Sequence, residues 1–208
     1  MFKKGLLLAF LVIMMPLAAE IKVLAFAGST RKDSYNKKLV QQAAEIARQK
    51  GAKVTVIDLI DYPMPLYDAD LEAKQGLPTF AKKLRDLMIQ HEAIIIATPE
   101  YNASISAILK NVLDWTSRDD GHYSPDAYEG KKFAIMSASP GKLGGARALV
   151  HLRAIIEGIG GEVIQKQVAV PDASKAFDAK GNLVSAELKK KLQEEVQQLL
   201  NSVPAKNT

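Results

Sequence analysis

The chain alternates between short, continuous apolar segments and longer segments in which apolar residues recur every three or four positions. The continuous segments cover residues 21–27, 53–57, 93–97, 133–137 and 162–170. Apolar runs of this length without strict alternation are typical of strands covered on both faces, as in a parallel sheet. The five runs therefore predict five buried strands that alternate with helices.

The periodic segments have the spacing of amphipathic helices. Their apolar stripes run through residues 39–46, 80–88, 105–112, 149–159 and 188–199. Gly51 ends the first stripe and Ser185 opens the last one, as helix boundaries commonly do. Strands that alternate with helices, without an internal repeat, predict one α/β domain. With right-handed crossovers, five strands suit a flavodoxin-like three-layer sandwich whose five-stranded parallel sheet has the order 2-1-3-4-5.

Residues 1–19 have the layout of a secretory signal peptide. Lys3 and Lys4 precede an almost wholly apolar stretch, and small residues lead up to Glu20. The apolar stretch is short for a comfortable membrane span, so we expect no stable span in the mature chain. Cleavage after Ala19 would leave residues 20–208 as a single domain in the periplasm or outside the cell. The alternatives are an uncleaved anchor, or a cytoplasmic protein whose true start lies further along the chain.

Composition narrows the chemistry. The chain has 208 residues, of which 48% are hydrophobic and 25% charged, with a formal net charge of +5. It has no basic stripe interleaved with aromatic residues, so nucleic-acid binding is not expected. The absence of cysteine excludes disulfides, thiolate metal sites and a cysteine nucleophile. His91, His122 and His151 lack metal-ligand spacing, and we expect surface or hydrogen-bonded histidines and no metal site.

Ligands of such sheets bind beyond the carboxyl ends of the strands, near the point where the strand order reverses. The first loop of interest, residues 28–36, joins the first strand to a helix whose N-terminus attracts anions. Ser29, Ser34 and Asn36 offer neutral donors, and Arg31 offers a charged fork for phosphate oxygens. The loop matches neither GxGxxG nor GxxxxGK[ST], which favours a terminal phosphate monoester. The alternative is a polar turn in which Ser34 or Asn36 caps the helix.

The second loop follows the third strand. Pro99 ends that strand and stiffens the turn, so that the next backbone amides can face a planar ligand. Tyr101 can lie along such a ligand, and Asn102 can offer its amide. Glu100 is expected to anchor the loop or a neighbouring subunit. The alternative is a strand-to-helix turn in which Asn102 caps a helix that starts near Ser104.

The third loop, residues 137–147, has three glycines within five positions and leads into another helix. Glycines let the backbone approach a ligand closely, and the helix N-terminus adds donors. The alternative is a flexible connection. No Ser/His/Asp set or paired carboxylates accompany the three loops, so we expect no catalytic side chain and place the chemistry on a cofactor.

Three ordered segments carry a resemblance to a known family: GSTRKDSYN, TPEYNASISAILKNVLDW and SASPGKLGGARALVHLR. Over roughly residues 21 to 170 the chain resembles the NAD(P)H-dependent FMN reductases, a family that includes flavin-dependent quinone, chromate and azo-dye reductases. The resemblance implies a flavodoxin-like fold, non-covalent FMN, NAD(P)H as co-substrate, and a homodimer or homotetramer. It implies a two-electron transfer to a small acceptor such as a quinone, flavin, azo compound or metal oxyanion. The alternatives are a flavodoxin-like electron carrier without nicotinamide oxidase activity and a binding protein that has lost flavin.

The resemblance also implies roles for individual residues. The implied phosphate ligands are Ser29, Arg31, Ser34 and Asn36. The implied neighbours of the flavin ring are Pro99, Glu100, Tyr101 and Asn102 on one side and Ser139, Gly144 and Gly145 on the other. The family often has proline where this chain has Ser106, which predicts a looser first helical turn. Residues 61–77 are expected to overhang the pocket and select the acceptor, or else to form a mobile loop. Residues 118–128 are expected to do the same, or else to contact a second subunit.

Overall fold

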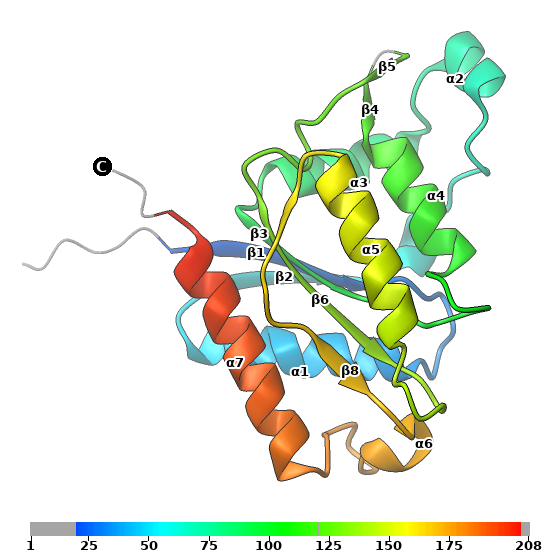
Figure 1. Cartoon of the computed structure of the whole chain (residues 1–208). Coiled ribbons are helices and arrows are strands. Elements are labelled where there is room, and N and C mark those ends of the chain that lie inside the picture. The colour runs from blue at the N-terminus through cyan, green and yellow to red at the C-terminus, as the bar shows by residue number, and fades with distance from the viewer. Residues whose placement is uncertain (1–19, 120, 205–208) are drawn as a thin grey trace, which may run out of the picture.

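A parallel sheet runs through the middle of the molecule in the computed structural model, which describes residues 20–119 and 121–204 (Figure 1). The strand order is β2-β1-β3-β6-β7, and β8 also pairs with β6. The bounds are β1 Lys22–Ala27, β2 Lys53–Ile57, β3 Ala93–Ala97, β6 Lys132–Ala138, β7 Glu162–Val163 and β8 Val168–Val170. Counted along the chain, this is the predicted order 2-1-3-4-5. The flavodoxin-like prediction is confirmed.

The fifth predicted strand is wrong in its middle. β7 pairs with the start of β6 and β8 with its end, while residues 164–167 leave the ladder. The Arg153 guanidinium donates to the carbonyls of Val163 and Ile164 at 3.0 Å and 2.7 Å. Lys166 forms an ion pair with Glu194. These contacts satisfy the backbone and side chains of the polar stretch away from the sheet, and the strand therefore splits in two.

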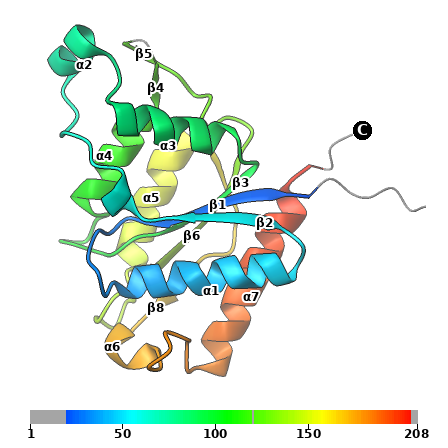
Figure 2. The same cartoon turned by 180° about the vertical axis from the view of Figure 1, so that it is seen from behind.

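Helices cover both faces of the sheet, as the views from front and back show (Figures 1 and 2). The first layer consists of α1 Tyr35–Gln49 and α7 Ala186–Ser202, and the second of α3 Thr79–Ile89, α4 Ala107–Thr116 and α5 Ala146–Gly158. In β1, Val23 and Ala25 belong to the core cluster of α1 and α7, whereas Leu24 and Phe26 belong to the other cluster. This alternation buries both faces of the strand and explains its continuous apolar run.

The small elements gather mainly beyond the second layer. They are the 3-10 helix η1 Leu59–Asp61, α2 Ala69–Gln75, the hairpin β4 Arg118–Asp119 with β5 His122–Tyr123, and α6 Ala173–Ala176. Figure 1 shows α2 and the hairpin at the same end of the molecule. Arg118 Nε donates to both oxygens of buried Glu72 in α2, at 3.1 Å and 3.0 Å. Trp115 in α4 donates to the Pro65 carbonyl at 2.9 Å. The hairpin is thus linked to α2, and the chain before α2 is linked to the C-terminal half of α4.

The predicted signal peptide, residues 1–19, lies outside the described residues. Within 20–119 and 121–204, no helix combines the length and apolar character needed to cross a bilayer.

Candidate cofactor-binding site

A hollow of about 140 Å³ lies at the carboxyl ends of β1, β3 and β6. Its lining is Ser29, Arg31, Ser34, Tyr35, Asn36, Pro99, Glu100, Tyr101, Ala138, Ser139 and Pro140. The three predicted loops therefore meet in one place, as expected for loops that follow neighbouring strands. Eight of the eleven predicted site residues line the hollow, and Asn102, Gly144 and Gly145 do not. The binding role of each residue stays a prediction.

The first loop presents donors to this hollow. Ser34 occupies the N-cap position of α1, but its hydroxyl makes no capping hydrogen bond, and the first turn has no acidic side chain. The Ser29 hydroxyl accepts a hydrogen bond from the Arg31 amide at 3.3 Å. The exposed Arg31 guanidinium lies 5.5 Å from the centre of the Tyr35 ring. A cation, two hydroxyls and a helix N-terminus on one hollow make a site for an anion.

Asn36 ties the first loop to the third. Its Nδ2 donates to the Ala138 carbonyl at 3.0 Å, and its Oδ1 accepts from the Ala138 amide at 2.9 Å. The side chain is buried, so this paired contact fixes the start of α1 against the end of β6. Neither predicted cap is therefore made: Ser34 has the position without the bond, and Asn36 lies inside the helix. Nδ2 carries a second N–H that can still face a ligand.

Glu100 ties the second loop to the third. Its carboxylate accepts from the Arg147 and Ala148 amides at 3.1 Å and 3.3 Å, and it forms an ion pair with the Arg147 guanidinium. Burial alone would raise the pKa of Glu100, but hydrogen bonds from Arg147 and Ala148 and the Arg147 charge together lower it. The carboxylate is thus directed at the N-terminus of α5. The prediction that Glu100 anchors its loop is confirmed.

A tight turn carries Tyr101. The Tyr101 and Ser104 backbones exchange two hydrogen bonds of 3.0 Å, and Asn102 and Ala103 between them have φ values of 50° and 65°. Two consecutive left-handed residues match a two-residue hairpin turn. His151 in α5 contacts the Ser104 hydroxyl at 2.9 Å. Tyr101 as a residue is 56% exposed and lies in the lining of the hollow.

The helix after this turn begins later than the sequence suggested. α4 starts at Ala107 with Ser106 as its N-cap, and the Ser106 hydroxyl accepts from the Leu109 amide at 3.2 Å. The prediction that Asn102 caps a helix near Ser104 is wrong, because Asn102 belongs to the hairpin turn. Ser106 also donates to the Gly28 carbonyl at 2.6 Å. The expected looser first turn is replaced by a defined cap.

The glycines of the third loop serve packing. A Cβ at Gly145 would lie 1.8 Å from Ser137 Oγ, and one at Gly144 would lie 2.7 Å from the Pro171 nitrogen. Both glycines have positive φ values, 61° at Gly144 and 91° at Gly145. They let the loop press onto the ends of β6 and β8, which favours a fixed loop over a flexible connection. Any contact of these two glycines with a ligand stays a prediction.

The comparisons with known proteins agree with this geometry. Residues 21–175 match the model of the NADPH-dependent FMN reductase family. The chain belongs to this family. An NAD(P)H-dependent FMN reductase of Pseudomonas aeruginosa is 35% identical over 181 residues, which cover 86% of this chain and 94% of the relative. An NADPH:quinone oxidoreductase of Arabidopsis thaliana is 35% identical over 179 residues, 84% of this chain and 87% of the relative.

A solved structure supports the same assignment. The flavoenzyme NAD(P)H:(acceptor) oxidoreductase from Paracoccus denitrificans superposes with a TM-score of 0.75 at 28% identity, covering 88% of this chain and 97% of that one. As a member of the FMN reductase family, the chain is an NAD(P)H-dependent flavin oxidoreductase with FMN as its cofactor. The predicted enzyme class and cofactor are confirmed.

The residues around the hollow fit the phosphate end of FMN. The hollow has room for a phosphate group, and its cation and donors complement a dianion. Glu100 would be the one acidic side chain in the lining, but its carboxylate is engaged by Arg147 and Ala148. Among the described residues, no group of three or more potential His or carboxylate ligands gathers.

Sequence reasoning missed two of the contacts that hold the loops together. The hydrogen bonds of Asn36 to Ala138 and of Ser106 to Gly28 join positions that are 102 and 78 residues apart. No local pattern predicts such pairs. The cap role of Ser106 did have a signal, because serine three positions before an apolar helical residue is a common N-terminus. Tyr35, Ala138 and Pro140 adjoin predicted residues and enter the lining with them.

Proposed function

We propose that the hollow holds the phosphate of FMN, and that the bound flavin passes two electrons from NAD(P)H to a small acceptor, with quinones as the leading class. One observation carries the placement. A helix N-terminus without acidic residues, an exposed arginine and two buried serines converge where the only carboxylate of the lining is engaged elsewhere. When bound, FMN supplies the redox chemistry by accepting a hydride and returning two electrons.

The chain's own part is binding and orientation. Arg31 neutralises phosphate charge, and the amides at the start of α1 donate to its oxygens. Tyr101 offers an exposed aromatic surface at the rim, beside which a planar ring can lie. The ties through Asn36 and Glu100 fix the distances between the loops, so that ordering them costs less when the flavin binds. The proposed reaction requires no proton transfer by a side chain.

Quinone acceptors are favoured by the relatives. Proteins named as NADPH:quinone oxidoreductase and 2-hydroxy-1,4-benzoquinone reductase are 35% and 33% identical to this chain. The exposed Tyr101 surface suits a flat acceptor that replaces nicotinamide at the same place. Residues 61–77 and 118–128 contribute nothing to the lining of the hollow, so a role for them in acceptor choice would require contact beyond it.

A spectrum with and without NADPH tests the activity. We expect the purified protein to be yellow and to bleach when NADPH is added without oxygen, with colour restored by a benzoquinone. A flavodoxin-like carrier would keep its oxidised spectrum in NADPH, and that result would overturn the reductase proposal.

Arg31→Ala tests the placement of the phosphate. Losing a charge-assisted contact should weaken FMN binding about tenfold or more and leave riboflavin binding nearly unchanged. Arg48→Ala is the matched control, because Arg48 is an exposed arginine in the last turn of α1, at the end away from the first loop. Equal losses for FMN and riboflavin in Arg31→Ala would contradict the placement.

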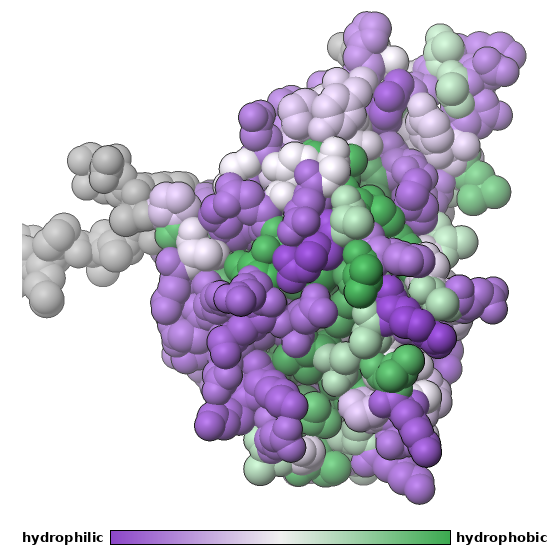
Figure 3. Space-filling model, in the orientation of Figure 1, coloured by the Kyte–Doolittle hydropathy of each residue, from purple (hydrophilic) through white to green (hydrophobic). Residues whose placement is uncertain are grey.

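Assembly and location are further parts of the proposal. Tyr101, Leu143 and Val150 are exposed apolar residues of the second and third loops and of α5. Hydrophobic side chains gather over α5 in the space-filling view, while the surface over α7 is polar (Figure 3). A homodimer or homotetramer through the α5 side would cover them, and light scattering would detect it.

Export with cleavage after Ala19 is tested by cell fractionation and N-terminal sequencing; a cytosolic protein that begins at Met1 would contradict it.

A further inference from the structure

Ser106 connects two of the loops around the hollow through one buried hydroxyl. The side chain is 3% exposed, and its Oγ donates to the Gly28 carbonyl at 2.6 Å. The same oxygen accepts from the Leu109 amide at 3.2 Å and so caps α4. The hydroxyl therefore joins the start of the first loop to the helix that follows the second loop.

Gly28 is held on both sides at this point. Its amide donates to the Ala97 carbonyl at the end of β3, at 2.8 Å, and its carbonyl is held by Ser106. A Cβ at Gly28 would lie 2.8 Å from Leu109 Cβ, so the glycine backbone presses directly against α4. The first loop leaves β1 from a fixed position.

The geometry of the peptide bond carries this position into the hollow. The Gly28 carbonyl and the Ser29 N–H share one planar peptide group and point in opposite directions. A hydrogen bond that draws the carbonyl toward α4 therefore turns the Ser29 N–H away from α4. Ser29 is the next residue and lines the hollow. Within the described part of the chain, its N–H makes no hydrogen bond, so it is available to a ligand.

We propose that Ser106 is a positioning residue for the FMN phosphate: by holding the Gly28 carbonyl, it aims the Ser29 amide and the start of the first loop at the phosphate oxygens. This role rests on the proposed function of the hollow. Ser106 does not line the hollow, so this role acts through Gly28 and Ser29.

The test compares FMN with riboflavin, which lacks the phosphate. Flavin is removed from the full-length protein, and dissociation constants for both flavins are measured by fluorescence quenching. In Ser106→Ala we expect FMN affinity to fall about tenfold and riboflavin affinity to change less than about twofold. Ser106→Thr keeps the hydroxyl and should restore the preference for FMN.

Ser185→Ala is the matched control. Ser185 is the N-cap of α7 and accepts from the Leu188 amide at 3.3 Å, but it lies outside the hollow. Both alanine variants lose a helix cap and should lower the melting temperature by a few degrees. Only Ser106→Ala should change the ratio of the two flavin affinities.

Two results would overturn the inference, and they differ. If the wild-type protein prefers FMN but Ser106→Ala keeps the same preference, Ser106 has only the capping role and the phosphate site stands. If the wild-type protein shows no preference for FMN over riboflavin, the phosphate site itself fails, and the role of Ser106 fails with it.

Discussion

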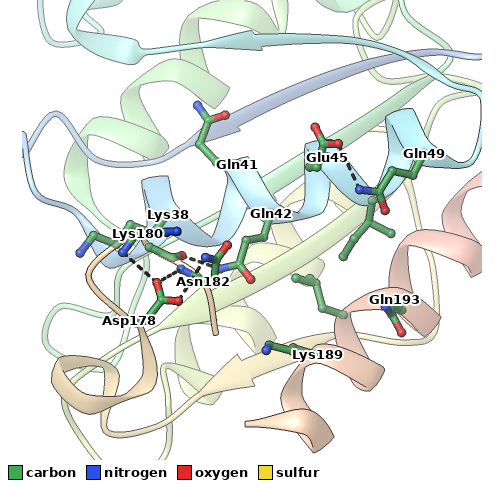
Figure 4. Close-up of a pocket in the computed structure, with 13 residues that line it drawn as sticks. Lys38, Gln41, Gln42, Glu45, Gln49, Asp178, Lys180, Asn182, Lys189 and Gln193 are labelled. Carbon is green, nitrogen blue, oxygen red and sulfur yellow. Dashed lines mark hydrogen bonds between the residues drawn. The ribbon is translucent and has the colours of Figure 1, made fainter. Parts of the chain in front are cut away.

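Two concave regions of this protein differ in a way that separates a binding site from a surface groove. The groove between α1 and α7 has a volume of about 590 Å³, against about 140 Å³ for the hollow at the carboxyl ends of the strands. Its labelled lining consists mostly of flexible lysine, glutamine and acidic side chains (Figure 4). Within it, Gln42 binds the backbone of Gly181 and Leu183, and Asp178 binds that of Lys180 and Asn182. The backbone groups of this turn are already satisfied locally.

The hollow has the opposite character. Three contacts tie its loops in pairs: buried hydrogen bonds between Asn36 and Ala138 and between Ser106 and Gly28, and a more exposed ion pair of Glu100 with Arg147. Because other groups fix the loops, the donors of the first loop and of the start of α1 are available to a ligand in the hollow. Convergent donors on a rigid frame mark a site better than volume does. The comparison predicts that matched substitutions in the two regions will differ in flavin binding more than in stability.

Glycine substitutions should give the largest difference. Gly145 and Gly181 have φ values of 91° and 85°, so alanine is strained at both, by roughly 1 kcal/mol. At Gly145 the new Cβ would also meet Ser137 Oγ at 1.8 Å, whereas at Gly181 the nearest atom, in Lys38, is 3.5 Å away. Gly145→Ala should lose about 3 kcal/mol of unfolding free energy and most FMN binding.

Gly181→Ala should lose only about 1 kcal/mol and bind FMN as the wild-type protein does. Urea denaturation and flavin titration of both variants provide the measurement. Equal FMN affinities in the two variants would show that the third loop does not shape the site.

Removal of the loop ties should give the next largest difference. Glu100→Ala removes the acceptor of the Arg147 side chain and of the Arg147 and Ala148 amides, so the second and third loops separate. We expect FMN affinity to fall about tenfold. Gln42→Ala removes two hydrogen bonds in the groove and should lower the free energy of unfolding by about 1–2 kcal/mol, without changing FMN affinity. A loss of flavin from Gln42→Ala would contradict the separation of the two regions.

Two glutamates extend the comparison to pH. Glu195 in α7 is fully buried, and burial raises its pKa well above 4.5, offset in part by the Val168 amide and by Arg153. A group whose pKa is raised in the folded state stabilises the protein at pH values below its unfolded-state pKa. This stabilisation is lost as the pH rises through its folded-state pKa. Glu195→Gln should therefore gain stability relative to wild type as the pH rises from about 5 to about 8.

The lowered pKa of Glu100 has the opposite sign. Its contribution is present above the pKa of the unfolded glutamate and is lost as the pH falls through the folded value. Glu100→Gln should therefore remove part of the acid-induced loss of stability and leave the neutral-to-alkaline slope unchanged. Urea denaturation at several pH values measures both effects. Parallel pH profiles for the two variants would be inconsistent with these assignments.

The contrast between the regions also explains what the sequence could predict. The strands, the main helices and the loops between them followed from apolar periodicity, because each strand and helix shows its buried face locally. The strand order required the rule of right-handed crossovers as well. The start of α4 was placed too early, because Asn102 and Ser106 are both plausible caps and only the Tyr101–Ser104 turn decides between them. The split of the fifth strand depends on Arg153, which a strand pattern does not reveal.

The sequence predicted most of the residues that line the site, but not the contacts that hold its loops in place. Serine, arginine and tyrosine near strand ends indicate ligand contact by their chemistry. The roles of Asn36 and Glu100 as ties depend on partners far along the chain, Ala138 and Arg147, and so required the structure. Gly145 looked like a ligand-facing residue, yet the side chain of Ser137 is what excludes a Cβ there.

The smallest effects should come from side chains that only line a concave surface. Lys189 and Gln193 are exposed on α7 in the groove, and alanine at both should change stability by less than about 0.5 kcal/mol and leave FMN affinity unaltered. Ser29→Ala makes a smaller truncation in the hollow, but it removes a buried hydroxyl beside the predicted phosphate. It should weaken FMN binding about threefold while riboflavin binding stays constant. Isothermal titration with both flavins can resolve a difference of this size. If the groove variant lost FMN as strongly as Ser29→Ala, lining residues and frame residues would be equivalent, and the distinction between the two regions would be wrong.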